Sequence, residues 1–194
     1  MKIVSKFHVG EEEMLHDRSC VYAAKADPAK FEVLYTKYYE QVLKFAYQRL
    51  DCKDAAFDIT QQVFLKAMQN LHKYEYRGLP FSAWLYRITI NELNMLFRKN
   101  KKEQALNIDI ASIGDMMEEM HEDSPEEKIN VVLNALAKLE REDLQIIEMR
   151  FFEKRAFKEI ADILSITENN AKVRTYRILD RLKEIITKRK GGSQ

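Results

Sequence analysis

The stretch that decides the fold reads FSAWLYRITINELNMLFRKNKK, from Phe81 to Lys102. Neither Pro nor Gly interrupts it, so the sequence predicts one helix over the whole stretch. Apolar side chains cover most of its circumference in two lines: Leu85, Ile88 and Leu96, and then Ala83, Tyr86, Ile90, Leu93 and Phe97. A helix with this much apolar surface is expected to be buried on most sides.

A polar edge runs along the same helix at steps of three and four residues: Trp84, Arg87, Asn91, Asn94 and Arg98, followed by Lys99 and Lys101. Arg binds phosphate, Asn pairs with base edges, and aromatic rings stack on unpaired bases. The pattern indicates a nucleic-acid-binding edge. The alternative is a core helix whose polar strip is only solvated, and this stretch alone leaves both open.

The composition favours an all-α fold, and the length allows one large domain or two small helical domains. The chain has 194 residues, 46% of them hydrophobic, with only three Pro and five Gly. No apolar run is long enough for a transmembrane helix, and the charged start lacks a signal-peptide core, so a cytoplasmic protein is expected. Cys20 and Cys52 have no metal-ligand spacing and are expected to be reduced thiols.

The net charge is only +1, but charge is segregated along the chain. No Lys or Arg occurs from Glu103 to Glu127, whereas Arg87–Lys102 and Lys172–Lys190 are rich in bases. We expect a first domain over 1–102 with a weakly patterned lead-in at 1–27. An acidic linker follows at 103–123 with at most a short helix near 113–120. A second domain covers 124–190, and a disordered tail covers 191–194.

The first domain begins its regular structure at Asp27-Pro28, a helix start that leads to about Leu50. The next helix, about 55–71, has two faces. Its buried face is expected to be Ala56, Ile59, Val63, Ala67 and Leu71, and its outer face holds Asp58, Gln61, Gln62, Leu65 and Gln69. A polar face with one apolar anchor is either an ordinary wet surface or a docking site for a partner helix.

The segment Tyr74–Pro80 is expected to be a loop that is aromatic, basic and broken by Gly78 and Pro80. Next to a basic edge, Tyr74, Tyr76, Arg77 and Phe81 are candidates for holding a flipped base. Packing of the two tyrosines against the core is the equally weighted alternative.

The second domain is predicted to open with a capping box, Ser124-Pro-Glu-Glu127, and to continue with a helix over 142–152. A helix at Phe157–Leu164, a tight Ser165-Ile166 connection and a helix from Thr167 to about Ile186 then have helix-turn-helix spacing. Its buried line is expected to end at Ile185, and its outward residues are Asn169, Asn170, Lys172, Val173, Arg174, Tyr176, Arg177 and Arg181. A basic αα-hairpin is the alternative to DNA binding.

Three motifs in this order resemble one family. Asp58-Ile-Thr-Gln61-Gln-Val-Phe64, Phe81-Ser-Ala-Trp84-Leu-Tyr-Arg-Ile88 and Phe157-Lys-Glu159-Ile-Ala161 with its second helix are similar to bacterial RNA polymerase sigma factors of the extracytoplasmic-function group. Together they cover about 31–186. Gln62, Met95 and Ser165 depart from the residues common in that group.

The resemblance implies a transcription initiation factor that binds core RNA polymerase and helps melt the minus-ten element. Asp58, Gln61, Gln62 and Leu65 would dock on the β′ clamp, with the β subunit as a second contact. The edge from Trp84 to Lys101 with the Tyr74–Phe81 loop would capture single-stranded minus-ten DNA. The second helix of the helix-turn-helix, from Thr167 to about Ile186, would be the recognition helix and would read the duplex minus-thirty-five element. The resemblance also implies an anti-sigma partner.

Other classes of function are less well supported by the residues. Four dispersed His, no glycine-rich phosphate loop and no metal-ligand spacing indicate no enzyme, no cofactor and no metal site. A stand-alone helix-turn-helix regulator would leave the polar edge of the first domain unexplained. A helical protein-interaction module would leave both basic surfaces merely solvated.

Overall fold

The computed structural model describes residues 10–50, 52–100, 110–120 and 126–188, and every regular element among them is helical. The chain divides into two compact units, one built mainly from α1 to α4 and the other from α5 to α9. Within these described ranges, no helix is both long and apolar enough to cross a lipid bilayer. The predicted all-helical class is confirmed.

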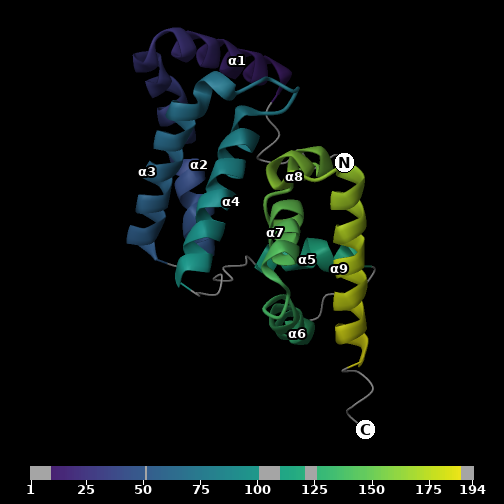
Figure 1. Ribbon diagram of the computed structural model, residues 1–194. Helices are drawn as coiled ribbons and strands as arrows, with labels where there is room; N and C mark the ends of the chain where they lie inside the picture. The colour runs from purple at the N-terminus through teal and green to yellow at the C-terminus, as the bar shows by residue number, and fades with distance from the viewer. Residues whose placement is uncertain (1–9, 51, 101–109, 121–125, 189–194) are drawn as a thin grey trace. The chain divides into compact units, whose positions relative to one another are not determined.

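The first unit contains three long helices packed side by side, with a fourth across one end (Figure 1). Its elements are α1 (Glu11–Ala26), the 3-10 turn η1 (Pro28–Phe31), α2 (Glu32–Leu50), α3 (Lys53–Asn70), the 3-10 turn η2 (Leu71–Lys73) and α4 (Phe81–Asn100). Asp27 caps η1, because its Oδ1 accepts a hydrogen bond from the Ala29 N–H at 3.1 Å. The helix start predicted at Asp27-Pro28 is therefore confirmed.

Helix α4 supplies a large part of this unit's core. Ala83, Tyr86, Ile90, Leu93 and Phe97 are all buried, as is Leu85 of the other apolar line. Ile88 and Leu96 are only half-buried, so one line of the predicted pair forms the core and the other borders it. Lys101 and Lys102, predicted as the end of this helix, lie outside the described residues.

Helix α1, in the lead-in that showed little pattern in sequence, is anchored by a buried carboxylate. The Tyr38 hydroxyl of α2 donates to Asp17, and Lys37 Nζ lies 2.6 Å from Asp17 Oδ1 and 2.9 Å from Glu13 Oε1. Burial, followed by this hydrogen bond, raises the pKa of Tyr38 well above its usual value. Burial lowers the pKa of Lys37, yet its bonds to Asp17 and Glu13 outweigh that effect and raise it.

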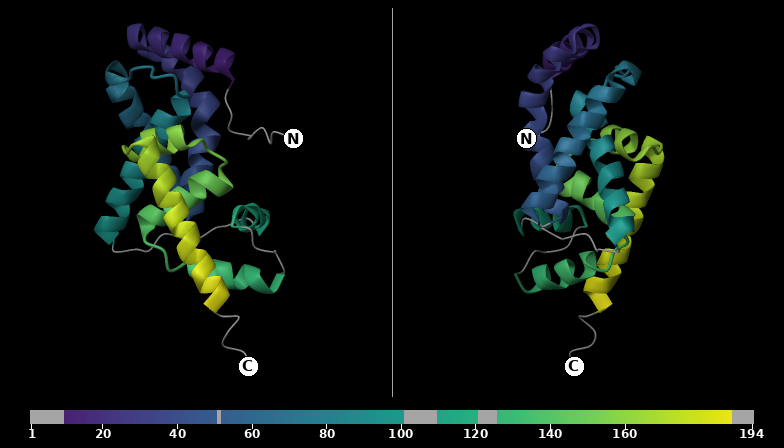
Figure 2. Two further views of the ribbon diagram at one scale, coloured as in Figure 1. Left: turned by 90° about the vertical axis from the view of Figure 1, so that its right-hand side faces the viewer. Right: turned by 60° about the vertical axis from the view of Figure 1, so that its left-hand side comes forward.

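The second unit contains α5 (Ile110–Glu119), α6 (Glu126–Leu136), α7 (Arg141–Ile147), one π-helical turn η3 (Glu148–Phe152), α8 (Phe157–Leu164) and α9 (Glu168–Lys188) (Figure 2). The short helix predicted inside the acidic linker starts three residues earlier than expected and packs on η3 and α6. Its Ile113, Met116, Met117 and Met120 are buried. This part of the predicted linker is therefore core structure, because its apolar residues recur at helical spacing. Ser124 of the predicted capping box lies outside the described residues.

The helix-turn-helix forms at the predicted residues. Helix α8 ends with Ser165 in the left-handed region at φ 57°, and the Ile166 N–H donates to the Ala161 carbonyl at 2.9 Å, as in a Schellman motif. Thr167 Oγ1 accepts from the Asn170 N–H at 3.2 Å and so caps α9. The buried line of α9 ends at Ile186, whereas Ile185, predicted to be buried, is 39% exposed.

A buried ion cluster fixes the chain between η3 and α8. Arg155 is 2% exposed, and its Nε lies 2.6 Å from Glu153 Oε2 while its Nη1 lies 3.2 Å from Glu159 Oε2. Breaking such a pair leaves a charge buried without compensation, which is costly. The first turn of α8 is therefore held in place by a charged contact as well as by its apolar face.

We expect Tyr38→Phe to lower the free energy of unfolding at pH 7 by about 1–3 kcal/mol, because buried Asp17 loses a donor. The wild-type chain should also lose stability above about pH 10, since the unfolded state releases the phenol proton that the folded state retains. Tyr38→Phe should reduce that alkaline loss. Urea unfolding followed by circular dichroism, at pH 7 and above about pH 10, measures the free energy of unfolding of both chains. Tyr22→Phe, at an exposed tyrosine, is the control. If Tyr38→Phe is as stable as the wild type at pH 7, the hydrogen bond from Tyr38 to Asp17 does not anchor α1.

We expect Ser165→Gly to raise the free energy of unfolding by about 1 kcal/mol, because Gly adopts a positive φ without the Cβ penalty. Thermal unfolding of the full chain measures the change. Lys158→Gly, an exposed site inside α8, should instead destabilise by a similar amount. A loss of stability in Ser165→Gly would show that the serine side chain supports the turn.

Candidate nucleic-acid interface

One exposed face of α3 carries the residues predicted as a docking site. Asp58, Gln61 and Gln62 are exposed, and Leu65 is 44% exposed. Behind them the predicted buried residues of α3 are all in the core, which confirms the two-faced assignment. Met68, also 44% exposed, extends the apolar anchor by one turn. Sequence analysis missed it, although the i+3 spacing from Leu65 was available as a signal.

Aromatic rings cluster where the Tyr74–Pro80 loop meets the start of α4. The Tyr74 ring lies 5.2 Å from Phe81 and 5.3 Å from Trp84, centroid to centroid, and Phe81 lies 5.5 Å from Trp84. Tyr74 is 8% exposed and Phe81 is 1% exposed, so both rings support Trp84 from behind. Burial raises the pKa of Tyr74 to about 12. Trp84 is the half-exposed ring of the cluster.

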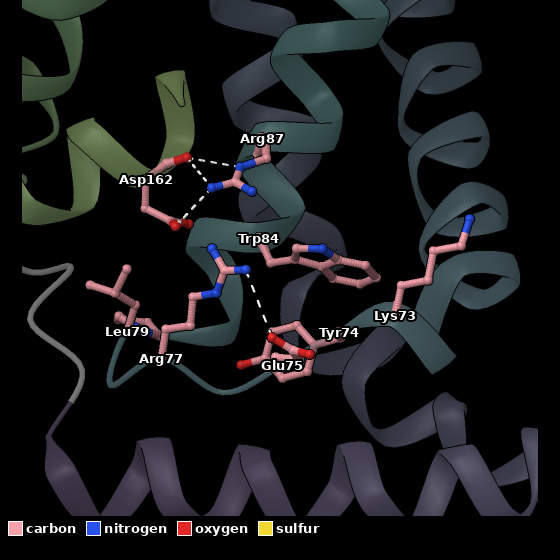
Figure 3. A pocket seen from close by; sticks show the side chains of 9 residues that line it. Lys73, Tyr74, Glu75, Arg77, Leu79, Trp84, Arg87 and Asp162 are labelled. Carbon is pink, nitrogen blue, oxygen red and sulfur yellow. Dashed lines mark hydrogen bonds and ion pairs between the residues drawn. The ribbon is translucent and has the colours of Figure 1, made fainter. Parts of the chain in front are cut away.

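The surroundings of Trp84 are polar and basic. Figure 3 shows its indole on α4 next to Tyr74, Glu75 and Arg77 of the loop. Arg77 is exposed, and its 3.8 Å ion pair with Glu75 joins two solvated side chains, so the pair contributes little to stability. Gly78 has φ 69°, a conformation that favours glycine, and it turns the loop back toward α4.

The polar edge continues along α4 from Trp84. Asn91, Arg98 and Lys99 are exposed, while Arg87 and Asn94 are half-buried, and Lys101 lies outside the described residues. The Arg98 Nε donates to the Asn94 carbonyl at 3.3 Å. The structure thus places the members of the edge that it describes along one side of a single rigid helix.

Helix α1 adds basic and aromatic residues beside the loop. The Arg18 guanidinium lies 5.5 Å from the Tyr22 ring and 5.3 Å from the Tyr76 ring, and Lys25 Nζ donates to the Tyr74 carbonyl at 2.7 Å. Tyr76, predicted as a site residue, is half-buried under this guanidinium. Sequence analysis missed these contacts, since α1 shows little amphipathic pattern.

A carboxylate links α3 to α4 on the inner side of the docking face. Lys66 Nζ lies 2.7 Å from both oxygens of Glu92, which is 9% exposed. Two such charge-assisted bonds to one group restrict the sliding of one helix on the other. The α3 face and the α4 edge are therefore parts of one rigid block.

The outward side of α9 is polar at its N-terminal end. Asn169, Asn170, Lys172, Val173, Tyr176 and Arg177 are all exposed. Arg174 and Arg181, predicted to be available to phosphates, instead both contact Asp143 of α7, with Arg174 Nη2 at 2.9 Å from Asp143 Oδ1. These two arginines hold α7 against α9, so Arg177 is the better placed of the three for a phosphate.

Metal ligation has no support in the described part of the chain, where no three His, Cys, Asp or Glu side chains gather as metal ligands would. Cys20 and Cys52 are free thiols, half-buried and exposed respectively. Cys20 Sγ lies 3.8 Å from His16 Nδ1 on the same face of α1. Two side chains do not complete a tetrahedral site.

Family models match both units. The model described as Sigma-70 region 2 matches residues 34–103, and that described as Sigma-70, region 4 matches residues 135–184. The chain belongs to the sigma-70 family of RNA polymerase sigma factors. The two matches contain α4 with its edge and the helix-turn-helix, respectively.

Curated relatives agree with this family. The ECF RNA polymerase sigma factor BldN of Streptomyces coelicolor is 26% identical over 84% of this chain and 62% of that protein. The RNA polymerase sigma factor YlaC of Bacillus subtilis is 26% identical over 81% of this chain and 92% of YlaC. The ECF RNA polymerase sigma factor SigW of Bacillus subtilis is 25% identical over 85% of this chain and 93% of SigW.

Solved structures share the fold. CnrH, in complex with the cytosolic domain of CnrY, superposes with TM-score 0.54 at 18% identity, covering 87% of this chain and 94% of that one. The sigma factor RpoE of Bartonella quintana, in complex with the anti-sigma factor NepR, gives TM-score 0.53 at 20% identity, covering 81% and 96%. Both show the same helical architecture.

We expect Trp84→Ala to weaken binding of single-stranded minus-ten DNA by about 5- to 150-fold, because stacking on an aromatic ring contributes roughly 1–3 kcal/mol per base. Trp84→Phe should retain most of the affinity. A fluorescent non-template oligonucleotide, titrated with the chain bound to core polymerase, measures it. Tyr47→Ala, which removes an exposed ring from α2, is the control. Equal affinity of Trp84→Ala and wild type would exclude Trp84 from the site.

Proposed function

We propose that this sigma factor initiates transcription through three surfaces: the α3 face binds core polymerase, the α4 edge captures the melted minus-ten strand, and α9 reads the minus-thirty-five duplex. The α4 edge carries the proposal, because a half-exposed Trp84 backed by buried rings heads a line of Asn and Arg on one helix.

The α3 face supports docking on the clamp of the β′ subunit. Leu65 and Met68 supply an apolar centre, and Asp58, Gln61 and Gln62 surround it with polar groups, which is the composition of an ordinary protein interface. The Lys66–Glu92 contact would then fix the polymerase relative to the DNA edge. Docking thereby places α4 over a defined stretch of promoter.

Melting follows from capture of open DNA, with no covalent step. Flipping a base costs on the order of a few kcal/mol, and stacking on an aromatic ring returns roughly 1–3 kcal/mol per base. Trp84 offers the ring, Asn91 and Asn94 offer amides to base edges, and Arg98 and Lys99 offer charge to phosphates. Buried Tyr74 and Phe81 fix the ring in advance, which lowers the entropy lost on binding.

The recognition helix divides its residues between base contacts and phosphate contacts. Asn169, Asn170, Lys172 and Val173 lie at the helix tip, where a helix enters the major groove. Arg177 would supply affinity for any sequence through a phosphate. Arg174 and Arg181 orient α9 through their ion pairs with Asp143 of α7. Their replacement should therefore act on DNA binding mainly by changing the orientation of α9 relative to α7, and less by removing positive charge.

Partners and location follow from the same role. The chain acts in the cytoplasm with the β′ and β subunits of core polymerase and with promoter DNA in duplex and single-stranded form. An anti-sigma factor is a further partner, as in the solved complex of RpoE with the anti-sigma factor NepR. The chain itself is not an enzyme, since the polymerase carries out the chemistry.

Run-off transcription tests the function directly. We expect start-site-specific transcripts from core polymerase only when the chain is added, and we expect Asp58→Arg with Gln61→Ala to abolish them together with binding to core polymerase. Reversing the charge at the docking face removes complementarity without touching the α3 core. Native gel shift of core polymerase measures the binding.

The control is Glu12→Arg, which makes the same charge change at an exposed site on α1. It should leave binding and transcription near wild type. Unchanged binding in the α3 double variant would remove the docking assignment. Transcripts that appear without the chain, or never appear, would remove the initiation role.

A further inference from the structure

The C-terminal end of the acidic helix α5 contacts one flank of the recognition helix α9. The Tyr176 hydroxyl donates to Glu119 Oε1 at 3.3 Å, and Lys183 Nζ donates to the Met120 carbonyl at 3.2 Å. Positions 169, 176 and 183 are seven apart and therefore share a flank of α9. Asn169 at the helix tip thus lies on the side of α9 that the C-terminal end of α5 contacts further along.

Helix α5 is held there by an apolar face rich in methionine. Ile113, Met116, Met117 and Met120 are at most 4% exposed and pack within the same unit, against η3 and α6. Asp115 forms an ion pair with Lys154, which follows η3. Three of the four apolar contacts are methionines, whose flexible side chains adapt to surfaces of different shape.

The end of α5 opposes DNA electrostatically. Glu118 and Glu119 are exposed at the C-terminus of the helix, where the helix dipole adds further negative charge. Phosphates that approach Lys172 or Tyr176 from this side would meet these like charges. The sequence from Glu103 to Glu127 holds no Lys or Arg to offset them.

We propose that α5 is an internal competitor of promoter DNA: docked on the helix-turn-helix unit, it lowers the affinity of α9 for duplex DNA, and its release raises that affinity. This inference rests on the proposed role of α9 in reading duplex DNA. If α5 is docked in most molecules, the apparent affinity for duplex DNA equals the affinity of the open form multiplied by the fraction of molecules that are open. The free factor is thereby kept from occupying promoters without polymerase.

Duplex binding by the full chain tests the competition. Glu118→Gln with Glu119→Gln should bind a minus-thirty-five duplex about 3- to 10-fold more tightly than wild type in fluorescence anisotropy at low salt. The matched control is Glu140→Gln with Glu142→Gln, two exposed acids of the α7 start in the same unit. It removes the same charge and should change affinity by less than about twofold.

A second variant weakens the docking without changing charge. Met117→Ala should also tighten duplex binding, because it removes part of the apolar face of α5. Hydrogen exchange provides a readout on α5 itself: its amides should exchange faster in Met117→Ala and in wild type saturated with duplex. Slower or unchanged exchange of α5 with DNA bound would overturn the proposal, as would weaker duplex binding by both variants.

The outcomes separate this inference from the initiation role. If run-off transcription succeeds but neither α5 variant binds duplex more tightly than its control, α5 is only a structural helix of its unit. If run-off transcription fails, the role of α9 in promoter reading fails first. Absence of duplex binding by every variant at low salt would also overturn the competition, since releasing α5 would then unmask no surface.

Discussion

The aromatic contact of Phe81 is the constraint on which the first unit depends. Its ring packs on Tyr38 of α2 at 5.7 Å, on Tyr74 of the loop and on Trp84 one turn along α4. Tyr38 in turn holds Asp17 of α1 through its hydroxyl. One buried ring therefore contacts helix α2, the loop and the half-exposed indole of Trp84. Any base that stacks on Trp84 does so against a surface fixed before DNA arrives, so little ordering remains to be done on binding.

The spacing of apolar residues along the sequence predicts much of this helical arrangement. The faces of α3, the core line of α4 and the Thr167 cap of α9 follow from apolar spacing and capping chemistry, and the structure agrees with them. Exposure of Asp58, Gln61 and Gln62 follows from the same rule. Local spacing decides these features because each depends on a helix presenting one side to its own core.

Other features required tertiary contacts that no spacing reveals. Helix α1 is tied down by a carboxylate whose partners are 20 and 21 residues away, so its sequence shows no apolar stripe. Arg174 and Arg181 were predicted to contact phosphates, but in the structure both form ion pairs with Asp143 of α7. Tyr74 and Phe81 were candidates for holding a flipped base, with core packing of Tyr74 as the alternative, and both are buried. Charge and aromatic residues in a sequence do not say which of them their own fold will use.

The methionines of α5 show the same limit and what it implies for function. The acidic segment between the two domains has the composition of a linker, with at most one short helix expected in it, yet its apolar residues are buried in the second unit. Such a helix gains stability by docking and none from its own propensity at ten residues. The apolar contacts of Ile113 and the three methionines therefore hold this helix in the second unit.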